Sequence, residues 1–141
     1  MSEENKLHSK VAVITGAAQG LGEAIAKEFA RQAAKVILVD INEQEIKRVK
    51  SEIEDEQLVA DICITDVCNS KAVNETFKDI IKKYKKIDIL VNGVGGFHKF
   101  DKLTDIDDAE WHKVINTNLN SAFYCTRAVM ESMEKNKFGR I

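Results

Sequence analysis

TGAAQGLG at residues 15–22 is the stretch that decides the fold of this 141-residue chain. It follows the apolar run VAVI at residues 11–14 and leads into apolar residues at helical spacing. A buried strand, a tight turn and a helix start bring unpaired N–H groups and the positive end of a helix dipole to one point. Gly16, Gly20 and Gly22 allow the backbone to turn sharply and to approach a ligand without a side-chain clash. The stretch therefore predicts a phosphate site, against the alternative of glycines that serve only turn and helix packing.

A second apolar run, VILV at residues 36–39, ends in the acid Asp40. A carboxylate at the end of a second strand can accept both hydroxyls of an adenosine ribose, so the glycine turn and Asp40 together indicate a nicotinamide dinucleotide. Ile41 follows this acid, and residues 17–19 of the turn supply no basic side chain for a 2′-phosphate. NAD is therefore favoured over NADP as the cofactor. The alternative is that Asp40 simply caps the next helix.

Strand and helix patterns alternate along the whole chain. We expect strands at 10–15, 35–40, 57–65 and 87–92, with a further strand beginning within 137–141. We expect helices at 20–33, 42–54 and 69–85, and one long helix from Asp107 or Asp108 to about Lys135. Apolar strands alternating with helices predict a parallel sheet covered on both faces. Right-handed crossovers then give a doubly wound, Rossmann-like α/β fold, with strand order 3-2-1-4 and a ligand crevice between the first and fourth strands.

Composition limits the class of protein. The length suits about one domain, and the formal net charge of −2 gives no reason to expect nucleic acid or an anionic membrane as a partner. No apolar stretch approaches a membrane span, and residues 1–9 read as a flexible N-terminal lead-in rather than a signal peptide. Three cysteines with no CxxC spacing argue against a disulfide framework or a metal site. We therefore expect reduced thiols in a cytoplasmic protein.

Four motifs carry a resemblance to a known family. The spacing G-x-x-x-G-x-G after Thr15 resembles the short-chain dehydrogenase/reductase family, as does Asp66-Val67 after the third expected strand. DILVNGVG at residues 88–95 is similar to the family's usual DILVNNAG, with Gly93 in place of the second asparagine and Val94 in place of the alanine. VINTNL at residues 114–119 is similar to the family's long-helix segment. The motifs occur in the family's order and extend over essentially the whole chain.

The resemblance implies roles for individual residues. Asp66 takes the position of the acid that contacts the adenine amino group, and the segment around Asn92 and Gly93 flanks the nicotinamide ribose. Asn118 takes the position of the family's catalytic asparagine, which supports a water-linked proton path. Asn92 could instead be a strand end, and Asn118 a solvent-facing helix residue. The expected cofactor-binding residues are Gly16, Ala18, Gln19, Gly20, Leu21, Gly22, Asp40, Ile41, Asp66, Val67, Asn92, Gly93 and Val94.

Two further catalytic motifs of the family have no counterpart in the chain. These are a serine after the fifth strand and a Tyr-x-x-x-Lys on the next helix; here Tyr84 is followed four residues later by Asp88, and Tyr124 by Ala128. We therefore expect residues 10–141 to be the N-terminal part of a single dinucleotide-binding domain, truncated after the long helix. Because the proton-transfer groups are missing, we expect this chain alone to be inactive.

For the full-length protein the resemblance implies an NAD-dependent oxidoreductase. It would transfer a hydride between nicotinamide and a secondary alcohol or ketone, such as a 3-oxoacyl thioester or a cyclic alcohol. A non-catalytic dinucleotide-binding or regulatory module is the alternative. Phe97, His98 and Phe100 could line a substrate pocket or lie on the surface. The family's use of the long helix as an interface implies a homodimer or homotetramer.

Overall fold

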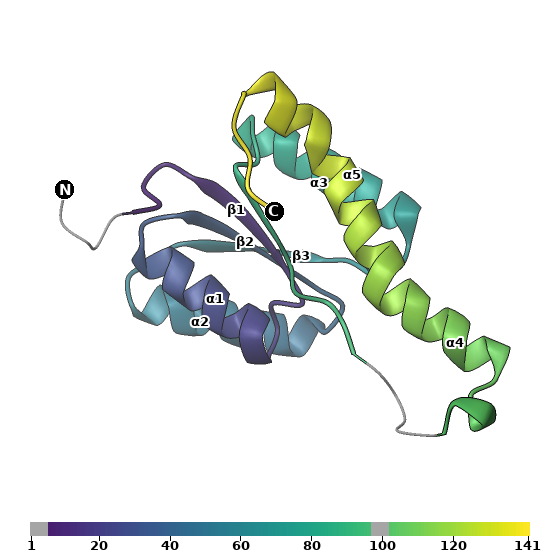
Figure 1. The fold of residues 1–141 in the computed structure, drawn as a ribbon. Helices are drawn as coiled ribbons and strands as arrows, with labels where there is room; N and C mark the ends of the chain where they lie inside the picture. Colours follow the sequence, from purple (N-terminus) through teal and green to yellow (C-terminus); the bar gives the residue numbers. More distant parts are fainter. Residues whose placement is uncertain (1–5, 97–101) are drawn as a thin grey trace.

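The computed structural model describes residues 6–96 and 102–141 as a single parallel sheet with helices on both faces (Figure 1). The strands are β1 (Val11–Thr15), β2 (Lys35–Asp40), β3 (Ala60–Ile64) and β4 (Ile89–Asn92). The helices that cross between them are α1 (Gly20–Arg31), α2 (Glu43–Asp55) and α3 (Ser70–Tyr84). A short 3₁₀ turn (Leu103–Asp105) precedes α4 (Asp108–Ile115), a π-helical turn (Asn116–Asn120) and α5 (Ser121–Lys135).

The strand order is β3-β2-β1-β4 and every pairing is parallel, so the predicted doubly wound topology is confirmed. Val13 of β1 lies opposite Ile37 of β2 on one side and Leu90 of β4 on the other. On the outer side of β4, Arg140 forms a parallel bridge with Ile89. The expected start of a further strand within residues 137–141 is therefore confirmed as well.

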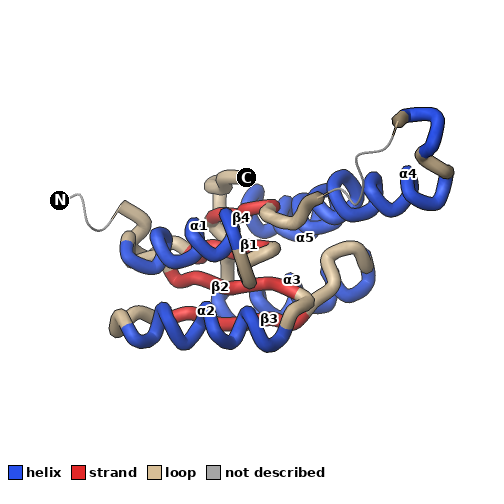
Figure 2. The backbone as a smooth tube through the Cα atoms, turned by 90° about the horizontal axis from the view of Figure 1, so that it is seen from below, coloured by secondary structure: helices blue, strands red, loops and turns tan. Residues whose placement is uncertain are grey.

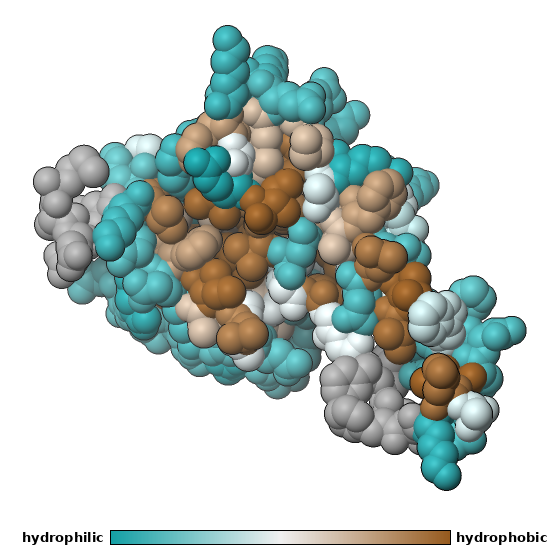
Figure 3. Space-filling view, viewed as in Figure 1, coloured by the Kyte–Doolittle hydropathy of each residue, from teal (hydrophilic) through white to brown (hydrophobic). Residues whose placement is uncertain are grey.

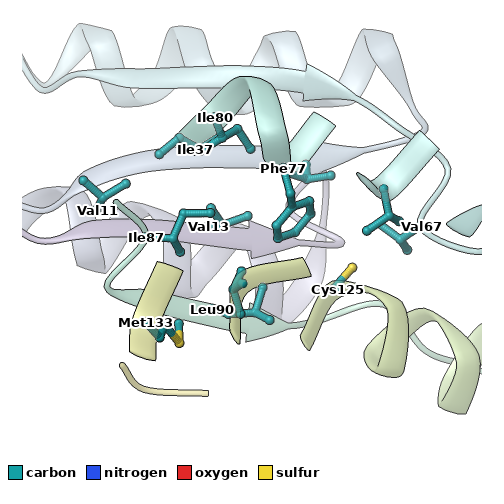
Figure 4. Close-up of a cluster of buried hydrophobic side chains, with 13 residues drawn as sticks. Val11, Val13, Ile37, Val67, Phe77, Ile80, Ile87, Leu90, Cys125 and Met133 are labelled. Carbon is teal, nitrogen blue, oxygen red and sulfur yellow. The ribbon is translucent and has the colours of Figure 1, made fainter. Parts of the chain in front are cut away.

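The sheet is buried on both faces because successive strand residues point to opposite sides. Val11 and Val13 of β1 pack with residues of α3 and α5, whereas Ala12 and Ile14 pack with residues of α1 and α2. The ribbon shows α1 and α2 below the sheet and α3 and α5 above it (Figure 1). Figure 4 shows the core on the α3 and α5 side, where Phe77 lies among aliphatic side chains and is 1% exposed. This double burial explains why the strands are continuous apolar runs.

The long helix predicted from Asp107 or Asp108 to about Lys135 is present, and a π-helical turn at Asn116–Asn120 interrupts its α-helical hydrogen bonding between α4 and α5. The start is as predicted, since Asp107 caps α4 by accepting a hydrogen bond from the Glu110 N–H (2.8 Å). Three asparagines and a threonine in the segment are weak helix formers whose side chains compete for backbone groups. The Asn118 amide, for example, donates to the Val114 carbonyl oxygen (2.9 Å). The hydroxyl of Ser121, the next residue after the turn, donates to the Thr117 carbonyl oxygen (2.6 Å). Figure 2 shows α4 extending well beyond the sheet.

The N-terminal residues that the structure describes lie against the end of α1. The Leu7 N–H donates to the Gln32 carbonyl oxygen (3.0 Å), and the Leu7 side chain packs on the core formed with α1 and α2. Residues 1–5 of the expected lead-in lie outside the described residues, so their flexibility stays a prediction.

The buried carboxylate of Asp88 gives a test of the sheet. Asp88 is 3% exposed and accepts hydrogen bonds from the Val11 N–H and from Lys86 Nζ, both at 2.8 Å. Replacing Asp88 by Ala leaves the Val11 N–H without its partner, so we expect the free energy of unfolding to fall by about 1.5–3 kcal/mol. Denaturant titration of the full-length protein measures the change. Asp61→Ala, which removes the partner of the exposed Lys83, is the control and should cost at most about 1 kcal/mol; equal losses would contradict the role of Asp88.

Candidate functional site

The turn between β1 and α1 depends on glycine at each of its three glycine positions. Gly16 (φ 66°) and Gly20 (φ 59°) have left-handed backbone conformations that favour glycine. At Gly22 the constraint is space, because an added Cβ atom would overlap the carbonyl oxygen of Gly16. Helix α1 starts inside this turn, and the Gln19 side chain makes no cap for it within the described residues. The first N–H groups of α1 are thus available to an anion.

A cavity of about 490 Å³ opens above the carboxyl ends of the strands. Its volume lies in the range of small-molecule sites, and its position at the switch point between β1 and β4 is where doubly wound sheets bind ligands. All the predicted cofactor-binding residues except Ala18 and Asn92 line it. The complete lining is Gly16, Gln19, Gly20, Leu21, Gly22, Asp40, Ile41, Thr65, Asp66, Val67, Cys68, Gly93, Val94, Gly95 and Thr117.

Ala18 and Asn92 lie behind the cavity wall. Ala18 is 2% exposed, and the Asn92 amide donates to the Thr126 hydroxyl of α5 (3.2 Å). Four lining residues were not predicted: Thr65, Cys68, Gly95 and Thr117. Thr65 and Cys68 flank the predicted pair Asp66-Val67, and the rule that ligands bind at the carboxyl ends of strands could have found them. Contact of any of these residues with a cofactor stays a prediction.

Asp40, half-buried at the end of β2, holds the glycine turn. Its Oδ2 atom accepts from the Ala18 N–H (3.1 Å) and its Oδ1 atom from the Asn42 N–H (2.9 Å). Asn42 is the residue that caps α2, through its side-chain oxygen and the Glu45 N–H (3.2 Å). The alternative interpretation of Asp40 as the helix cap is therefore wrong. Each carboxylate oxygen has a further lone pair, so the side chain can still accept ligand hydroxyls in the cavity that it lines.

The segment after β3 adds an acid and a thiol to the cavity. Asp66 is exposed and its Oδ1 atom accepts from the Cys68 N–H (2.9 Å), while the side chain of Val67 is buried. Burial, followed by the charge of Asp66, raises the pKa of the Cys68 thiol. Burial also raises the pKa of Cys125, to about 12. Both side chains are therefore thiols at neutral pH, not reactive thiolates.

The main chain at the end of β4 packs directly on the main chain at the end of β1. The Gly93 N–H donates to the Thr15 hydroxyl (3.1 Å), and a Cβ atom added at Gly93 would overlap the Thr15 carbonyl oxygen. On the other side, a Cβ atom added at Gly16 would lie 2.7 Å from the Gly93 carbonyl oxygen. The glycine that replaces the family's second asparagine thus fits a place with no room for a side chain.

Asn118, in the π-helical turn, joins the long helix to the loop after β4. Its amide nitrogen donates to the carbonyl oxygens of Gly96 (2.6 Å) and Val114 (2.9 Å). Its side-chain oxygen accepts from the Gly96 N–H (2.9 Å). The Asn118 side chain therefore positions main chain beside the cavity. Phe97, His98 and Phe100 lie outside the described residues, and their expected place at a pocket is not tested.

The described residues show neither a cluster of metal ligands nor a helix suited to cross a membrane. Within residues 6–96 and 102–141, no three His, Cys, Asp or Glu side chains come together as metal ligands. Among the helices of that same part of the chain, none combines the length and apolar character needed to cross a bilayer.

A parallel doubly wound sheet, a glycine turn at the start of α1 and a cavity at the switch point define a dinucleotide-binding type of α/β domain. A model of the short chain dehydrogenase family matches residues 10–141. The chain belongs to the short-chain dehydrogenase/reductase family.

Curated and solved relatives agree with this assignment. The chain is 36% identical over 135 residues to the (2S)-[(R)-hydroxy(phenyl)methyl]succinyl-CoA dehydrogenase subunit BbsD of Thauera aromatica, covering 96% of this chain and 54% of that relative. An NAD⁺-bound xylitol dehydrogenase superposes with a TM-score of 0.92 at 27% identity, over 97% of this chain and 53% of the other. A metagenomic short-chain oxidoreductase in complex with NADP superposes with a TM-score of 0.90 at 29% identity, over 94% and 60%. The chain thus spans about half the length of these relatives.

The close approach at Gly22 can be tested by substitution. Alanine at this helical position gains up to about 1 kcal/mol of helix propensity, but its Cβ atom overlaps the Gly16 carbonyl oxygen, which no rotamer change relieves. We expect Gly22→Ala to lose about 1–3 kcal/mol of unfolding free energy in denaturant titration. Gly20→Ala, where the space is open and only the backbone conformation is strained, should cost about 1–2 kcal/mol. A Gly22→Ala protein as stable as the natural one would show that the overlap is absent.

Proposed function

We propose that the full-length protein is an NAD-dependent oxidoreductase that transfers a hydride between nicotinamide and a secondary alcohol or ketone. The observation that carries this proposal is the carboxylate of Asp40 at the same cavity as the uncapped start of α1. A pyrophosphate would bind at the N–H groups of α1, where the helix dipole favours an anion. The ribose hydroxyls would then reach Asp40 at the end of the neighbouring strand. When bound, the nicotinamide supplies hydride acceptor and donor chemistry.

Charge at the ribose end supports NAD rather than NADP. Asp40 would repel a 2′-phosphate, and the next residue, Ile41, is apolar and 68% exposed at the cavity. Residues 17–19 of the turn contribute no cation. One solved relative holds NAD⁺ and another NADP, so the preference proposed here depends on these residues of the chain.

The substrate class follows from the family and its relatives. A secondary alcohol or ketone is the proposed substrate, with 3-oxoacyl thioesters and cyclic alcohols as the classes of interest. The relative named as a (2S)-[(R)-hydroxy(phenyl)methyl]succinyl-CoA dehydrogenase subunit supports the thioester class. Asn118 would act in proton transfer by holding the loop after β4 and the π-helical turn in place.

Assembly through the long helix is part of the proposal. Exposed apolar side chains occur along it, at Trp111 (55%), Leu119 (61%) and Phe123 (54%). Figure 3 shows apolar surface along this part of the molecule. Because such a stripe is too apolar for full exposure, it supports a homodimer or homotetramer of the full-length protein. The three cysteines are free, which is consistent with the proposed cytoplasmic location, where disulfides are rare.

The cofactor preference is tested by titrating NADH and NADPH into the full-length protein. Asp40→Ala should weaken NADH binding about tenfold more than NADPH binding, because the lost carboxylate accepts ribose hydroxyls and repels a 2′-phosphate, whereas its support of the turn through the Ala18 N–H serves both cofactors. Ile41→Arg should strengthen NADPH binding. Asp55→Ala, at the far end of α2, is the matched control and should change neither affinity.

Equal weakening of both cofactors by Asp40→Ala would mean that the carboxylate only supports the turn. A natural protein that prefers NADPH tenfold, about 1.4 kcal/mol, would overturn the proposed preference.

Asn118 is tested by separating turnover from cofactor affinity. In the full-length protein, Asn118→Ala should lower kcat by about 10²-fold or more, in line with the contribution of general acid–base catalysis. The dissociation constant of NAD should stay within a few-fold, because Asn118 is not among the residues that line the cavity. Asn120→Ala is the control, since Asn120 lies in the same turn but donates only to the Asn116 side chain (3.0 Å). An unchanged kcat in Asn118→Ala would make this an ordinary helix residue.

A further inference from the structure

The guanidinium of Arg48 on α2 has a partner for every N–H group. An arginine side chain has five N–H donors. Nε donates to Glu45 (2.8 Å), and Nη1 donates to Glu23 (3.1 Å) and Glu52 (2.8 Å). Nη2 donates to Glu23 (2.9 Å) and to the carbonyl oxygen of Ala18 (3.3 Å). One side chain of α2 therefore holds both α1 and the glycine turn, which lie on the same face of the sheet (Figure 1).

Ala18 is held from two sides by these contacts. Its N–H donates to Asp40 at the end of β2, and its carbonyl oxygen accepts from Arg48. The residue is 2% exposed and lies two residues before the start of α1. The position of the glycine turn relative to the cavity is thus fixed by one residue in β2 and one in α2.

Glu23 places a negative charge in the first turn of α1, next to the proposed pyrophosphate position. Its side chain is 18% exposed and also pairs with Lys27 of the same helix. Hydrogen bonds from Arg48 and then from Lys27 lower the pKa of Glu23 to about 2, so the carboxylate is ionised at neutral pH. An unpaired carboxylate at this place would repel an anionic ligand and compete with it for the helix dipole.

We propose that Arg48 is a positioning residue of the dinucleotide site, an inference that rests on the proposed function. It fixes the Ala18 carbonyl and neutralises Glu23, and both effects favour the binding of a pyrophosphate at the start of α1. Because all five of its N–H groups are engaged, Arg48 does not bind a 2′-phosphate. Its removal therefore weakens NAD(H) and NADP(H) by the same factor.

Arg31 offers a matched control. It also joins α1 to the end of α2, with Nε donating to Glu56 Oε2 (2.7 Å) and Nη2 to Oε1 (2.6 Å). It lies in the last turn of α1, at the opposite end from the glycine turn. Arg31→Met removes a bidentate ion pair between the same two helices without touching the cavity wall. A comparison with Arg48→Met separates loss of helix pairing from loss of ligand positioning.

The experiment measures NADH and NADPH dissociation constants by fluorescence, together with the melting temperature without cofactor, on the full-length protein. Arg48→Met should weaken both cofactors about fivefold or more, in line with the effect of a charge at a helix N-terminus. Arg31→Met should leave both dissociation constants within twofold of those of the natural protein. It should lower the melting temperature by about as much as Arg48→Met does. Glu23→Gln alone should bind NADH within twofold of the natural protein. The double variant with Glu23→Gln and Arg48→Met should recover part of the lost affinity, because the carboxylate that Arg48 helps Lys27 to neutralise is gone.

Two results would overturn the inference, and a third would overturn its electrostatic part. In the first, the Arg48→Met variant binds both cofactors as tightly as the Arg31→Met variant does, which would leave Arg48 only a helix-pairing role. A loss confined to NADPH would mean that Arg48 contacts the 2′-phosphate. A double variant as weak as Arg48→Met would remove neutralisation of Glu23 as a cause. A natural protein that binds neither NADH nor NADPH would contradict the proposed function itself. A failure of the proposed function can therefore be told apart from a failure of the role proposed for Arg48.

Discussion

The contact on which the structure depends is the approach of three main-chain segments without side chains between them. Gly22 at the start of α1 packs on the Gly16 carbonyl oxygen, and Gly93 after β4 packs on the Thr15 carbonyl oxygen. A side chain at either place would separate the start of α1 from β1, or the end of β4 from β1. The cavity lies where these segments meet, and Gly16, Gly22 and Gly93 are among the residues that line it. Backbone N–H groups in such a place can face an anion directly.

Polar side chains then hold this backbone arrangement in place. Asp40 and Arg48 fix the two ends of the Ala18 residue, and Asn118 fixes the loop after β4 through the main chain of Gly96. Each of these side chains comes from a different part of the chain. The site therefore combines a main-chain surface that can bind phosphate with side chains that order it, and ordering in advance lowers the entropy cost of binding.

The sequence was sufficient to predict the strand order, the glycine turn and Asp40, because these follow from local periodicity and from the rule for parallel sheets. Asp66, Val67, Gly93 and Val94 of the cavity lining were predicted from the resemblance to the family. The π-helical turn could not be predicted in this way, since the backbone angles are helical at Ile115 and Ser121 on either side of it, and the Asn118 side chain of the turn contacts a distant loop. The place of Asn92 was missed for a similar reason, because the partner of its amide is Thr126 on α5. The saturated guanidinium of Arg48 depends on how α1 and α2 pack. Periodicity gives the elements, whereas these features arise from contacts between elements.

The double role of Asp40 explains how cofactor choice and turn geometry are linked. The same carboxylate accepts two main-chain N–H groups and lines the cavity, so replacing it to admit a 2′-phosphate would also release Ala18 and Asn42. The buried Ala18 N–H would then need another acceptor, at a cost of about 1–3 kcal/mol if none is found. Arg48 holds the opposite side of Ala18, through its carbonyl oxygen, and so restrains the turn independently of Asp40. A change of cofactor in this chain therefore requires a new acceptor for the Ala18 N–H as well as a new cation for the phosphate.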